Sequence, residues 1–469
     1  MKKLLVICLS LLVGISAGAI VRPASLFNDG MVLQQQSNVR FWGRAKANTT
    51  VKVKGSWNNH TVSCKSDADG KWELLLPTPK ASFKPYKVTL SDGDKLTINN
   101  VLIGEVWLGS GQSNMEMMVY GFINCPVENS ARFISESYKY RDRIRLVKIP
   151  RFPLRQEAEY VEAKWQECTP EVVRTASAVG YFFATLISDK LNVPVGIINS
   201  SWGGTRVEGW TPKDLLEGYG EKLDVEVFKN RANSATPMVM YNGMLKPLAG
   251  YTLKGFLWYQ GEANVWQANT YANHLSNMIN RWRSDWKQGD LPFLFVEIAP
   301  YQYNTGNEQS AYLREAQCEV QHMVNNAYMV CTNDLVTPFE RRQIHPMKKY
   351  EVAERLSLLA LNKVYGMKGI NSQSPEFQTM TVKDGKAILT FNNVDAGFNR
   401  FDDIEGFEIC GADKKFVPAT GVWLEGRRVV VTSNLVKEPV AVRYCFKDFQ
   451  IGNLANGDNL PVIPFRTDK

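Results

Sequence analysis

Apolar and polar side chains alternate in short runs over residues 20–100. Such runs lie at 39–42, 50–53 and 72–75, and turn dipeptides at Asp69-Gly70 and Asp92-Gly93 separate them. Alternation with a period of two is typical of half-buried strands, and no helix-length period interrupts it. The pattern predicts a β-sandwich-like domain at residues 20–100.

From residue 101 the pattern changes to continuous apolar runs that alternate with helical stretches. The apolar runs lie at 106–108, 194–198, 255–258 and 292–296, and the helical stretches lie near 174–191, 267–286, 309–324 and 347–365. This alternation predicts an α/β domain over residues 101–370, in which helices cover both faces of a parallel sheet. Short strands such as 386–391 and 428–432 follow, so a second β-rich domain is predicted at 371–469.

Residues 1–19 have the features of a secretory signal peptide. Two lysines precede an apolar run that ends near Ile15, and Ala17-Gly18-Ala19 provides a small-residue cleavage pattern. No later stretch approaches the roughly 20 apolar residues of a transmembrane helix. We therefore expect the protein to be exported to the periplasm or the medium, with a lipid anchor on Cys8 as the alternative.

The composition excludes disordered and low-complexity classes, because 44% of the 469 residues are hydrophobic and 22% are charged. The surplus of 55 Lys and Arg over 47 Asp and Glu is scattered, so it does not indicate a nucleic-acid partner. The cysteines after the leader form no Cys-x-x-Cys pair, which argues against zinc and redox motifs and favours apolar packing. None of these numbers indicates an oligomeric state.

A glycine-rich loop follows the apolar run 106–108, at the edge where open parallel sheets collect functional groups. It reads Gly109-Ser110-Gly111-Gln112-Ser113-Asn114-Met115. Small residues allow a sharp turn that would present Ser113 to a substrate carbonyl. Asn114 replaces the third glycine of a dinucleotide loop and Met115 the last glycine of a Gly-x-Ser-x-Gly elbow, so both motifs are incomplete. Ser113 is a candidate nucleophile, with a structural turn serine as the alternative.

A serine nucleophile needs a base, usually histidine, and the chain has only four histidines. His60 lies among turn residues, whereas His274 and His322 fall inside predicted helices, so surface or packing roles are expected for all three. His345 follows a polar loop and precedes Pro346 and a helix, which is the setting of a catalytic loop. This elimination leaves His345 as the candidate base, with capping of that helix as its alternative role.

Four short blocks follow one another along the chain. They read Gly111-Gln112-Ser113-Asn114-Met115, Ser201-Trp202-Gly203-Gly204-Thr205, Trp258-Tyr259-Gln260-Gly261-Glu262 and Ile344-His345-Pro346. In this order they resemble the blocks of the sialate O-acetylesterases, a branch of the SGNH hydrolases. The resemblance implies a flavodoxin-like three-layer α/β core that removes acetyl esters from sugars, especially sialic acids, without a metal or other cofactor.

The resemblance also implies roles for individual residues. Ser113 would be the nucleophile and His345 the general base. The oxyanion hole would consist of the backbone N–H groups of Ser113 and Gly204 and the side-chain amide of Gln260. Loss of one oxyanion donor typically costs about 10²–10³ in rate.

The acid of the triad departs from the family pattern. An Asp usually stands shortly before the histidine, but Arg342 and Gln343 occupy those positions here. Glu262 is the first candidate, because related carbohydrate esterases are thought to use a glutamate of that block; its alternative role is to hold the oxyanion loop. Glu340 and Asp334 are lesser candidates, and a Ser-His dyad assisted by Gln343 is the remaining option.

The substrate itself suggests further residues. Arginine binds carboxylates such as that of sialic acid bidentately, so Arg206, Arg341 and Arg342 are candidate substrate ligands. Trp202 offers an aromatic face to a sugar ring. Three functions follow: a sialate O-acetylesterase, an esterase of acetylxylan or another acetylated polysaccharide, and a glycan-binding protein whose catalytic core has decayed.

Overall fold

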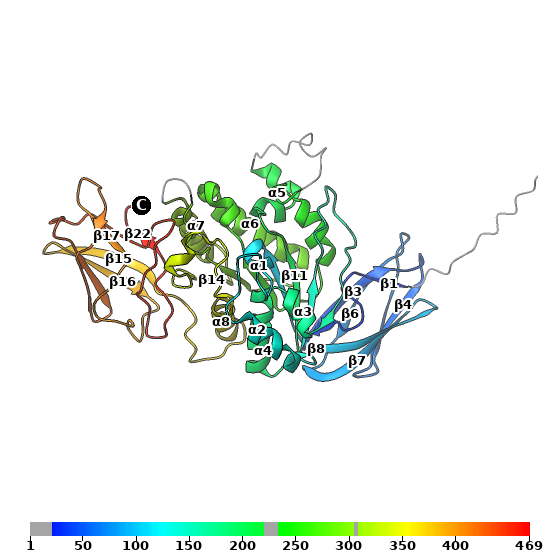
Figure 1. The fold of residues 1–469 in the computed structure, drawn as a ribbon. Coiled ribbons are helices and arrows are strands. Elements are labelled where there is room, and N and C mark those ends of the chain that lie inside the picture. Colours follow the sequence, from blue (N-terminus) through cyan, green and yellow to red (C-terminus); the bar gives the residue numbers. More distant parts are fainter. Residues whose placement is uncertain (1–20, 220–232, 304–307) are drawn as a thin grey trace, which may run out of the picture.

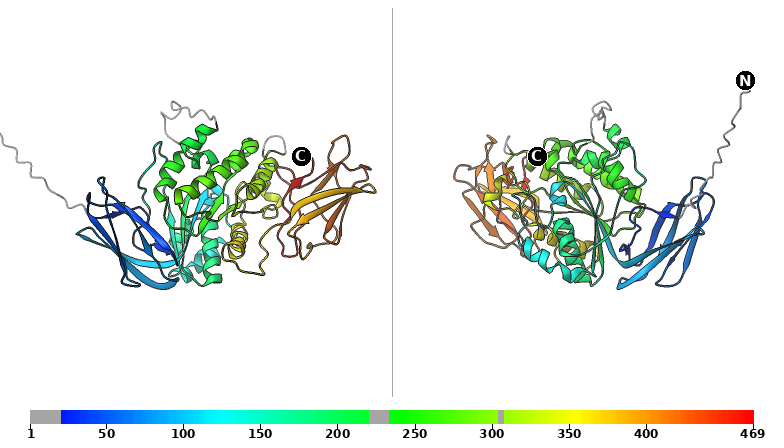
Figure 2. Two further views of the ribbon diagram at one scale, coloured as in Figure 1. Left: turned by 180° about the vertical axis from the view of Figure 1, so that it is seen from behind. Right: turned by 45° about the vertical axis from the view of Figure 1, so that its right-hand side comes forward.

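The structure is a computed structural model that describes residues 21–219, 233–303 and 308–469. A central α/β part lies between two β-rich parts, one at each end of the described chain (Figures 1 and 2). The predicted signal peptide lies outside the described residues. In the described ranges, no helix is both long and apolar enough to cross a membrane. The α/β class with additional β-rich parts is confirmed, and the domain limits stay predictions.

The N-terminal part contains two layers of short strands. One layer is β1 (Arg22–Pro23), β3 (Asn38–Arg44) and β6 (Lys71–Pro77), and the other includes β2 (Val32–Gln34), β4 (Thr50–Gly55), β5 (Thr61–Lys65) and β7 (Ser82–Ser91). Exposed and buried residues alternate without exception along β4 and β6, so every second side chain points inward. The strands predicted from this alternation are present.

Strand β8 (Lys95–Gly111) connects the N-terminal part to the central part without a break. Its first half pairs with β7 and β2, and its second half pairs with β11 and β12. Every residue of β8 from Val101 onward is buried. The change in the sequence pattern at residue 101 therefore marks the point where burial becomes two-sided, in the middle of a strand.

The central sheet has β8 in its middle. Its other strands are β9 (Ile144–Lys148), β10 (Gln166–Glu167), β11 (Val195–Ser201), β12 (Gly255–Tyr259), β13 (Phe293–Val296) and β14 (Ala327–Val330), in the order β10-β9-β11-β8-β12-β13-β14. All neighbours pair in parallel except the edge strand β10. The carboxyl ends of β8, β11 and β12 therefore meet at one edge.

Helices cover both faces of this sheet, as predicted (Figure 1). Trp107 of β8 packs with α4 (Ala178–Leu191) and α8 (Lys349–Leu359), whereas its neighbours Val106 and Leu108 pack with α6 (Ala268–Trp286) and α7 (Gln309–Met323). The shorter helices are α1 (Ser113–Glu116), α2 (Ser130–Glu136), α3 (Pro170–Thr175) and α5 (Lys213–Gly218). The four long helices agree with the predicted stretches.

The C-terminal part contains two four-stranded sheets. They are β15 (Glu376–Lys383), β16 (Lys386–Asn392), β20 (Arg428–Thr432) and β19 (Gly421–Glu425), and β18 (Val417–Pro418), β17 (Phe407–Cys410), β21 (Ala441–Tyr444) and β22 (Phe465–Arg466). Leu389 and Val431 from the first sheet share one apolar core with Ile409 and Val442 from the second. This part is β-rich, as predicted.

Candidate active site

Ser113 lies just beyond the carboxyl end of β8, as the first residue of α1. The turn before it depends on Gly111, which has φ +131°, and a Cβ there would lie 2.2 Å from the carbonyl oxygen of Tyr259. The backbone N–H of Gln112 donates to that same carbonyl at 3.0 Å. Glycine therefore allows β8 and β12 to approach closely while the chain turns to present Ser113.

The loop after β11 lies against Ser113. The backbone N–H of Gly203 donates to Glu116 Oε2 at 2.7 Å, and a Cβ on Gly203 would lie 3.2 Å from the Ser113 Cβ. Gly204 is exposed and has φ +74°. No residue that the structure describes accepts a hydrogen bond from the backbone N–H of Ser113 or of Gly204. Two unpaired donors beside a serine are what an oxyanion hole requires.

Gln260 is in a different state, because it is fully buried and its amide is already hydrogen-bonded. Its Nε2 donates to Asn264 Oδ1 at 2.7 Å and to the Thr205 carbonyl at 3.1 Å, with Gln112 Oε1 at 3.3 Å. An amide has two N–H groups, so both have acceptors here. In this arrangement Gln260 holds the loops together, and its role as an oxyanion donor stays a prediction.

The His345 loop is tied to the Ser113 loop. Asn114 Nδ2 donates to the carbonyl of Ile344 at 3.0 Å. The half-buried imidazole of His345 packs edge-on against Phe122, with ring centroids 5.1 Å apart. Burial, together with the positive charge of Lys349, lowers the pKa of His345 to about 4. Because this pKa lies well below 7, the imidazole is neutral at pH 7. It makes no hydrogen bond to any described residue, so it is available to accept a proton.

Three of the predicted helpers of His345 are occupied elsewhere. Asp334 forms an ion pair with Arg355 at 2.6 Å. Glu340 accepts hydrogen bonds from Thr337 and from the backbone N–H of Met347, at 2.9 and 3.0 Å. Gln343 Oε1 lies 3.0 Å from Cys125 Sγ and 3.4 Å from the backbone nitrogen of His345. None of the three hydrogen-bonds to the imidazole.

Glu262 is buried and reaches the His345 loop only through Asn114. Its Oε1 accepts a hydrogen bond from Asn114 Nδ2, the same amide that donates to Ile344, and its Oε2 has no described partner. Burial raises the pKa of Glu262, against the opposing effects of its backbone and Asn114 hydrogen bonds and the charge of Lys349. Glu262 therefore supports the peptide before His345, and its role as the orienting acid stays a prediction.

Comparison with known proteins identifies the family of this chain. The family described as "carbohydrate esterase, sialic acid-specific acetylesterase" matches residues 103–358, more than half of the chain. The chain belongs to this family. It is a hydrolase that acts on acetylated carbohydrates.

Relatives of this esterase match over most of its length. The sialate O-acetylesterases of Homo sapiens and Pongo abelii are each 29% identical over 445 residues, which cover 86% of this chain and 83% of theirs. The crystal structure of a carbohydrate acetylesterase from Xanthomonas citri is 32% identical, covers 96% of this chain and 100% of its own, and superposes with a TM-score of 0.86.

The esterase has a buried lysine close to His345 that the sequence analysis missed. Lys349 is 1% exposed, its Nζ donates to the Pro346 carbonyl at 2.6 Å, and it lies 5.7 Å from the centre of the Tyr259 ring. Burial lowers its pKa to about 7, although Glu262 and Glu340 act in the opposite direction. Lys349 is the first residue of α8, where a cation opposes the helix dipole. This unusual position was the sequence signal that could have marked Lys349.

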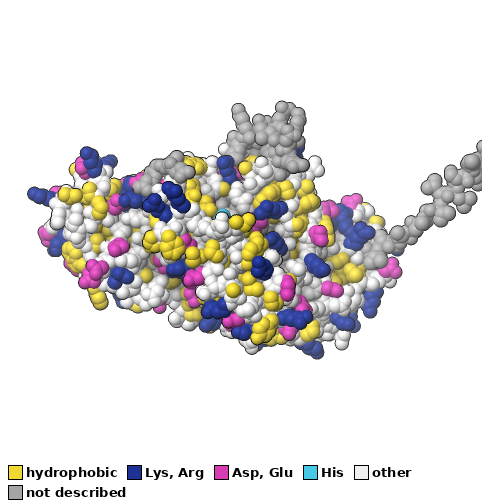
Figure 3. All heavy atoms as spheres, in the orientation of Figure 1, with side chains coloured by type: hydrophobic (Ala, Val, Ile, Leu, Met, Phe, Trp, Pro, Cys, Tyr) yellow, Lys and Arg dark blue, Asp and Glu magenta, His cyan; other side chains and the backbone are white. Residues whose placement is uncertain are grey.

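The predicted substrate residues lie on the surface of the esterase. Arg206, Arg341 and Arg342 are exposed, and none forms an ion pair with a described residue. Trp202 is half-buried under Arg151, whose guanidinium lies 5.5 Å from the ring centre and pairs with Glu116 at 2.6 Å. Sequence reasoning missed Arg151, because it lies far along the chain from every block. Elsewhere, charges of both signs are interspersed over the face in Figure 3.

Proposed function

We propose that this chain is an exported serine esterase that removes O-acetyl groups from sialic acids through an acyl-enzyme formed on Ser113. The observation that carries the proposal is the position of Ser113, beside two backbone N–H groups without described acceptors and on a loop bonded to that of His345. Without β9 and β10 at one edge, the central sheet has the sequence order 2-1-3-4-5, which is that of flavodoxin-like sheets. This order supports an SGNH-type core.

In the first half of the reaction, Ser113 Oγ attacks the acetyl carbonyl and His345 accepts the hydroxyl proton. The N–H groups of Ser113 and Gly204 donate to the oxygen that becomes negative. When the tetrahedral intermediate collapses, the ester bond to the sugar breaks and His345 returns the proton to the sugar oxygen. In the second half, His345 deprotonates water, which attacks the acetyl-serine. The bond to Ser113 Oγ then breaks, acetate leaves, and His345 returns the proton to Ser113 Oγ.

No carboxylate of the described residues hydrogen-bonds to the imidazole, so support of His345 takes an indirect form in this proposal. Asn114 fixes the peptide before His345, and Glu262 fixes Asn114. The imidazole is oriented by its packing on Phe122. A carboxylate in direct contact would also stabilise the imidazolium, and Glu262 would supply that stabilisation only through the electric field of its charge.

Sialic acid is the proposed substrate because the named mammalian relatives are sialate O-acetylesterases. The three exposed arginines, which have no ion-pair partner among the described residues, provide positive charge for its carboxylate. An acetylated polysaccharide is the alternative, since the relative from Xanthomonas citri is named only as a carbohydrate acetylesterase. Acetate release from O-acetylated sialic acid and from acetylated xylan, measured side by side, separates the two.

Ser113→Ala tests the chemistry. We expect it to abolish p-nitrophenyl acetate hydrolysis while the thermal unfolding curve is unchanged. Ser110→Ala is the matched control, because Ser110 is a buried serine of the same segment whose hydroxyl has no described partner. An unchanged rate in Ser113→Ala contradicts the proposal. Binding of acetylated glycan without acetate release by the folded wild type would instead indicate the decayed glycan-binding protein.

Export is tested separately. Expression of the full sequence and of a chain that begins after residue 19 should place the first outside the cytoplasm and leave the second inside. A precursor of full length in the cytoplasm contradicts the predicted leader. If the export prediction fails, the proposed esterase chemistry is unaffected, because no leader residue belongs to the site.

A further inference from the structure

Helix α7 connects the central part to the C-terminal part through one stripe of residues. Ser310, Arg314, Cys318 and His322 follow one another at intervals of four, so they lie along one face of the helix. Ser310 bonds to Asp448 at 3.0 Å, and Arg314 donates to the carbonyl of Lys447. The last two residues of the stripe both face Glu376, the first residue of β15.

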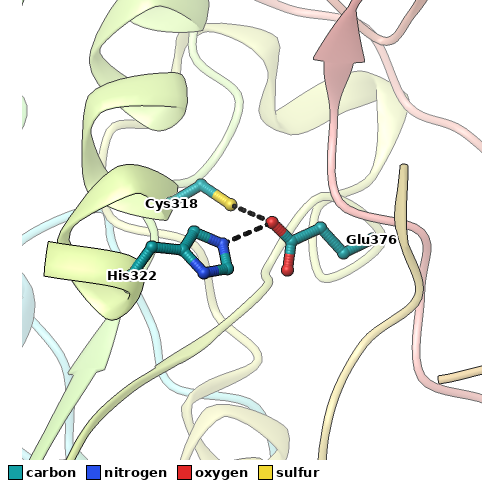
Figure 4. Close-up of side chains that lie close together, drawn as sticks. All are labelled: Cys318, His322 and Glu376. Atoms are coloured by element: carbon teal, nitrogen blue, oxygen red, sulfur yellow. Dashed lines mark hydrogen bonds and ion pairs between the residues drawn. The ribbon is translucent and has the colours of Figure 1, made fainter. Parts of the chain in front are cut away.

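Three different ligand groups converge there, as Figure 4 shows. His322 Nε2 lies 2.6 Å from Glu376 Oε1, and Cys318 Sγ lies 3.6 Å from the same oxygen. One ligand atom from each residue lies within 4.8 Å of the others. Two groups from one helix turn and one from a distant strand thus point at a common centre.

We propose that Cys318, His322 and Glu376 form a zinc site that joins α7 to the start of the C-terminal part. Thiolate, imidazole and carboxylate together are a ligand set that zinc accepts, at about 2.0–2.3 Å from each atom. Tetrahedral ligands at these lengths lie about 3.5 Å apart. The Sγ to Oε1 distance of 3.6 Å already matches, whereas the imidazole, 2.6 Å from the carboxylate oxygen, must withdraw from it.

The exposure of the three groups suits a zinc ion with one open position. The His322 side chain is 60% exposed and can move, whereas that of Glu376 is 23% exposed and Cys318 is half-buried. Water would take the fourth position. Gln321 Nε2 lies 3.4 Å from Cys318 Sγ and 3.5 Å from Glu376 Oε2, so it would orient both ligands from the outer shell.

This site is separate from the esterase chemistry. The catalytic steps proposed above use none of its residues, and zinc would act by fixing the join between two parts of the chain. The site could not be predicted from the sequence because Glu376 lies 54 residues after His322. The Cys-x-x-x-His spacing on a predicted helix was the only local signal.

Titration of the full-length chain, freed of any affinity tag and of bound metal, with Zn²⁺ and Co²⁺ tests the proposal. We expect one Zn²⁺ per chain, a thiolate-to-cobalt absorption band, and a higher melting temperature with Zn²⁺. Cys318→Ser should abolish the cobalt band and the melting shift. His322→Ala and Glu376→Gln should weaken Zn²⁺ binding at least about tenfold.

Cys64→Ser and His60→Ala are matched controls, because these residues lie in the N-terminal part and outside the cluster. Both should bind Zn²⁺ as the wild type does. Absence of binding in the wild type overturns the proposal, and so does equal binding by Cys318→Ser, which would mean an adventitious ion only. If Cys318→Ser lacks the cobalt band but unfolds like the wild type in the metal-free state, the loss of the band is due to lost ligation and not to misfolding.

Discussion

The side-chain amide of Asn114 donates a hydrogen bond to the backbone carbonyl of Ile344, 3.0 Å away. The same nitrogen donates to Glu262, so one amide joins the serine loop, the loop after β12 and the histidine loop. Along the chain, Glu262 lies 148 residues and Ile344 lies 230 residues after Asn114. The relative position of Ser113 and His345 therefore depends on a residue that does not itself react.

Glu262→Gln should lower kcat by at least about 10², within the range expected when an orienting carboxylate is lost. Gln can still accept the Asn114 hydrogen bond, so the substitution removes the charge and keeps the contact. Asn114→Ala should also lower kcat, because it removes the hydrogen bonds that connect Glu262 and the peptide before His345. Near-normal turnover in Glu262→Gln would assign the supporting role to another group.

The pH profile of kcat/KM should have its acidic limb near pH 4. His345 acts as a base only when neutral, and burial lowers its pKa to about 4. Activity should therefore be retained between about pH 5 and 7 and fall about tenfold per unit below the pKa. Hydrolysis of p-nitrophenyl acetate measured across this range gives the midpoint. A midpoint near 6.5, the ordinary pKa of histidine, would contradict the buried environment of His345.

Lys349→Met should move this acidic limb to higher pH. The positive charge of Lys349 disfavours the imidazolium form, so its removal raises the pKa of His345. Met has a similar length and suits a buried position. Lys348→Met is the matched control, since Lys348 is the neighbouring lysine and does not act on His345. An unmoved limb in Lys349→Met, with folding retained, would remove Lys349 from the control of the base.

Arg206→Ala, Arg341→Ala and Arg342→Ala test how the substrate carboxylate is bound. If one of these arginines holds it, that variant should raise KM for O-acetylated sialic acid about tenfold or more and leave p-nitrophenyl acetate unaffected, because the small ester has no carboxylate. Arg427→Ala, an exposed arginine of the C-terminal part, is the control. Unchanged KM values in all three variants would favour a neutral acetylated polysaccharide.

The secondary structure could be predicted where the pattern was strong. Helix α6 and strand β12 follow directly from long amphipathic or short apolar runs. Strand β9 was missed, because the charged Arg145 is its second residue; this arginine is buried and donates hydrogen bonds to carbonyl groups. The continuity of β8 was also missed, since composition changes at residue 101 although the backbone does not.

The site was predictable only where a residue belongs to a block. Ser113 and Gly204 lie at strand ends with glycines around them, and His345 could be found by elimination. The Asn114 bridge, the burial of Lys349 and the pairing of Arg151 with Glu116 depend on which distant loops meet. Such contacts are a property of the packed structure, and apart from the cation in the first turn of α8, local pattern carries no information about them.

Gly203→Ala should lower kcat by about 10-fold to 10²-fold with little change in KM for p-nitrophenyl acetate. A Cβ on Gly203 would lie 3.2 Å from both Glu116 Oε2 and the Ser113 Cβ, so the loop must shift. The shift would displace the neighbouring Gly204 N–H, and removal of one oxyanion donor costs about 10²–10³. Gly218→Ala is the control, because a Cβ there meets no atom of the described residues within 4 Å. If Gly203→Ala keeps the wild-type kcat, the loop after β11 does not supply an oxyanion donor, and the proposed pair of N–H groups is wrong.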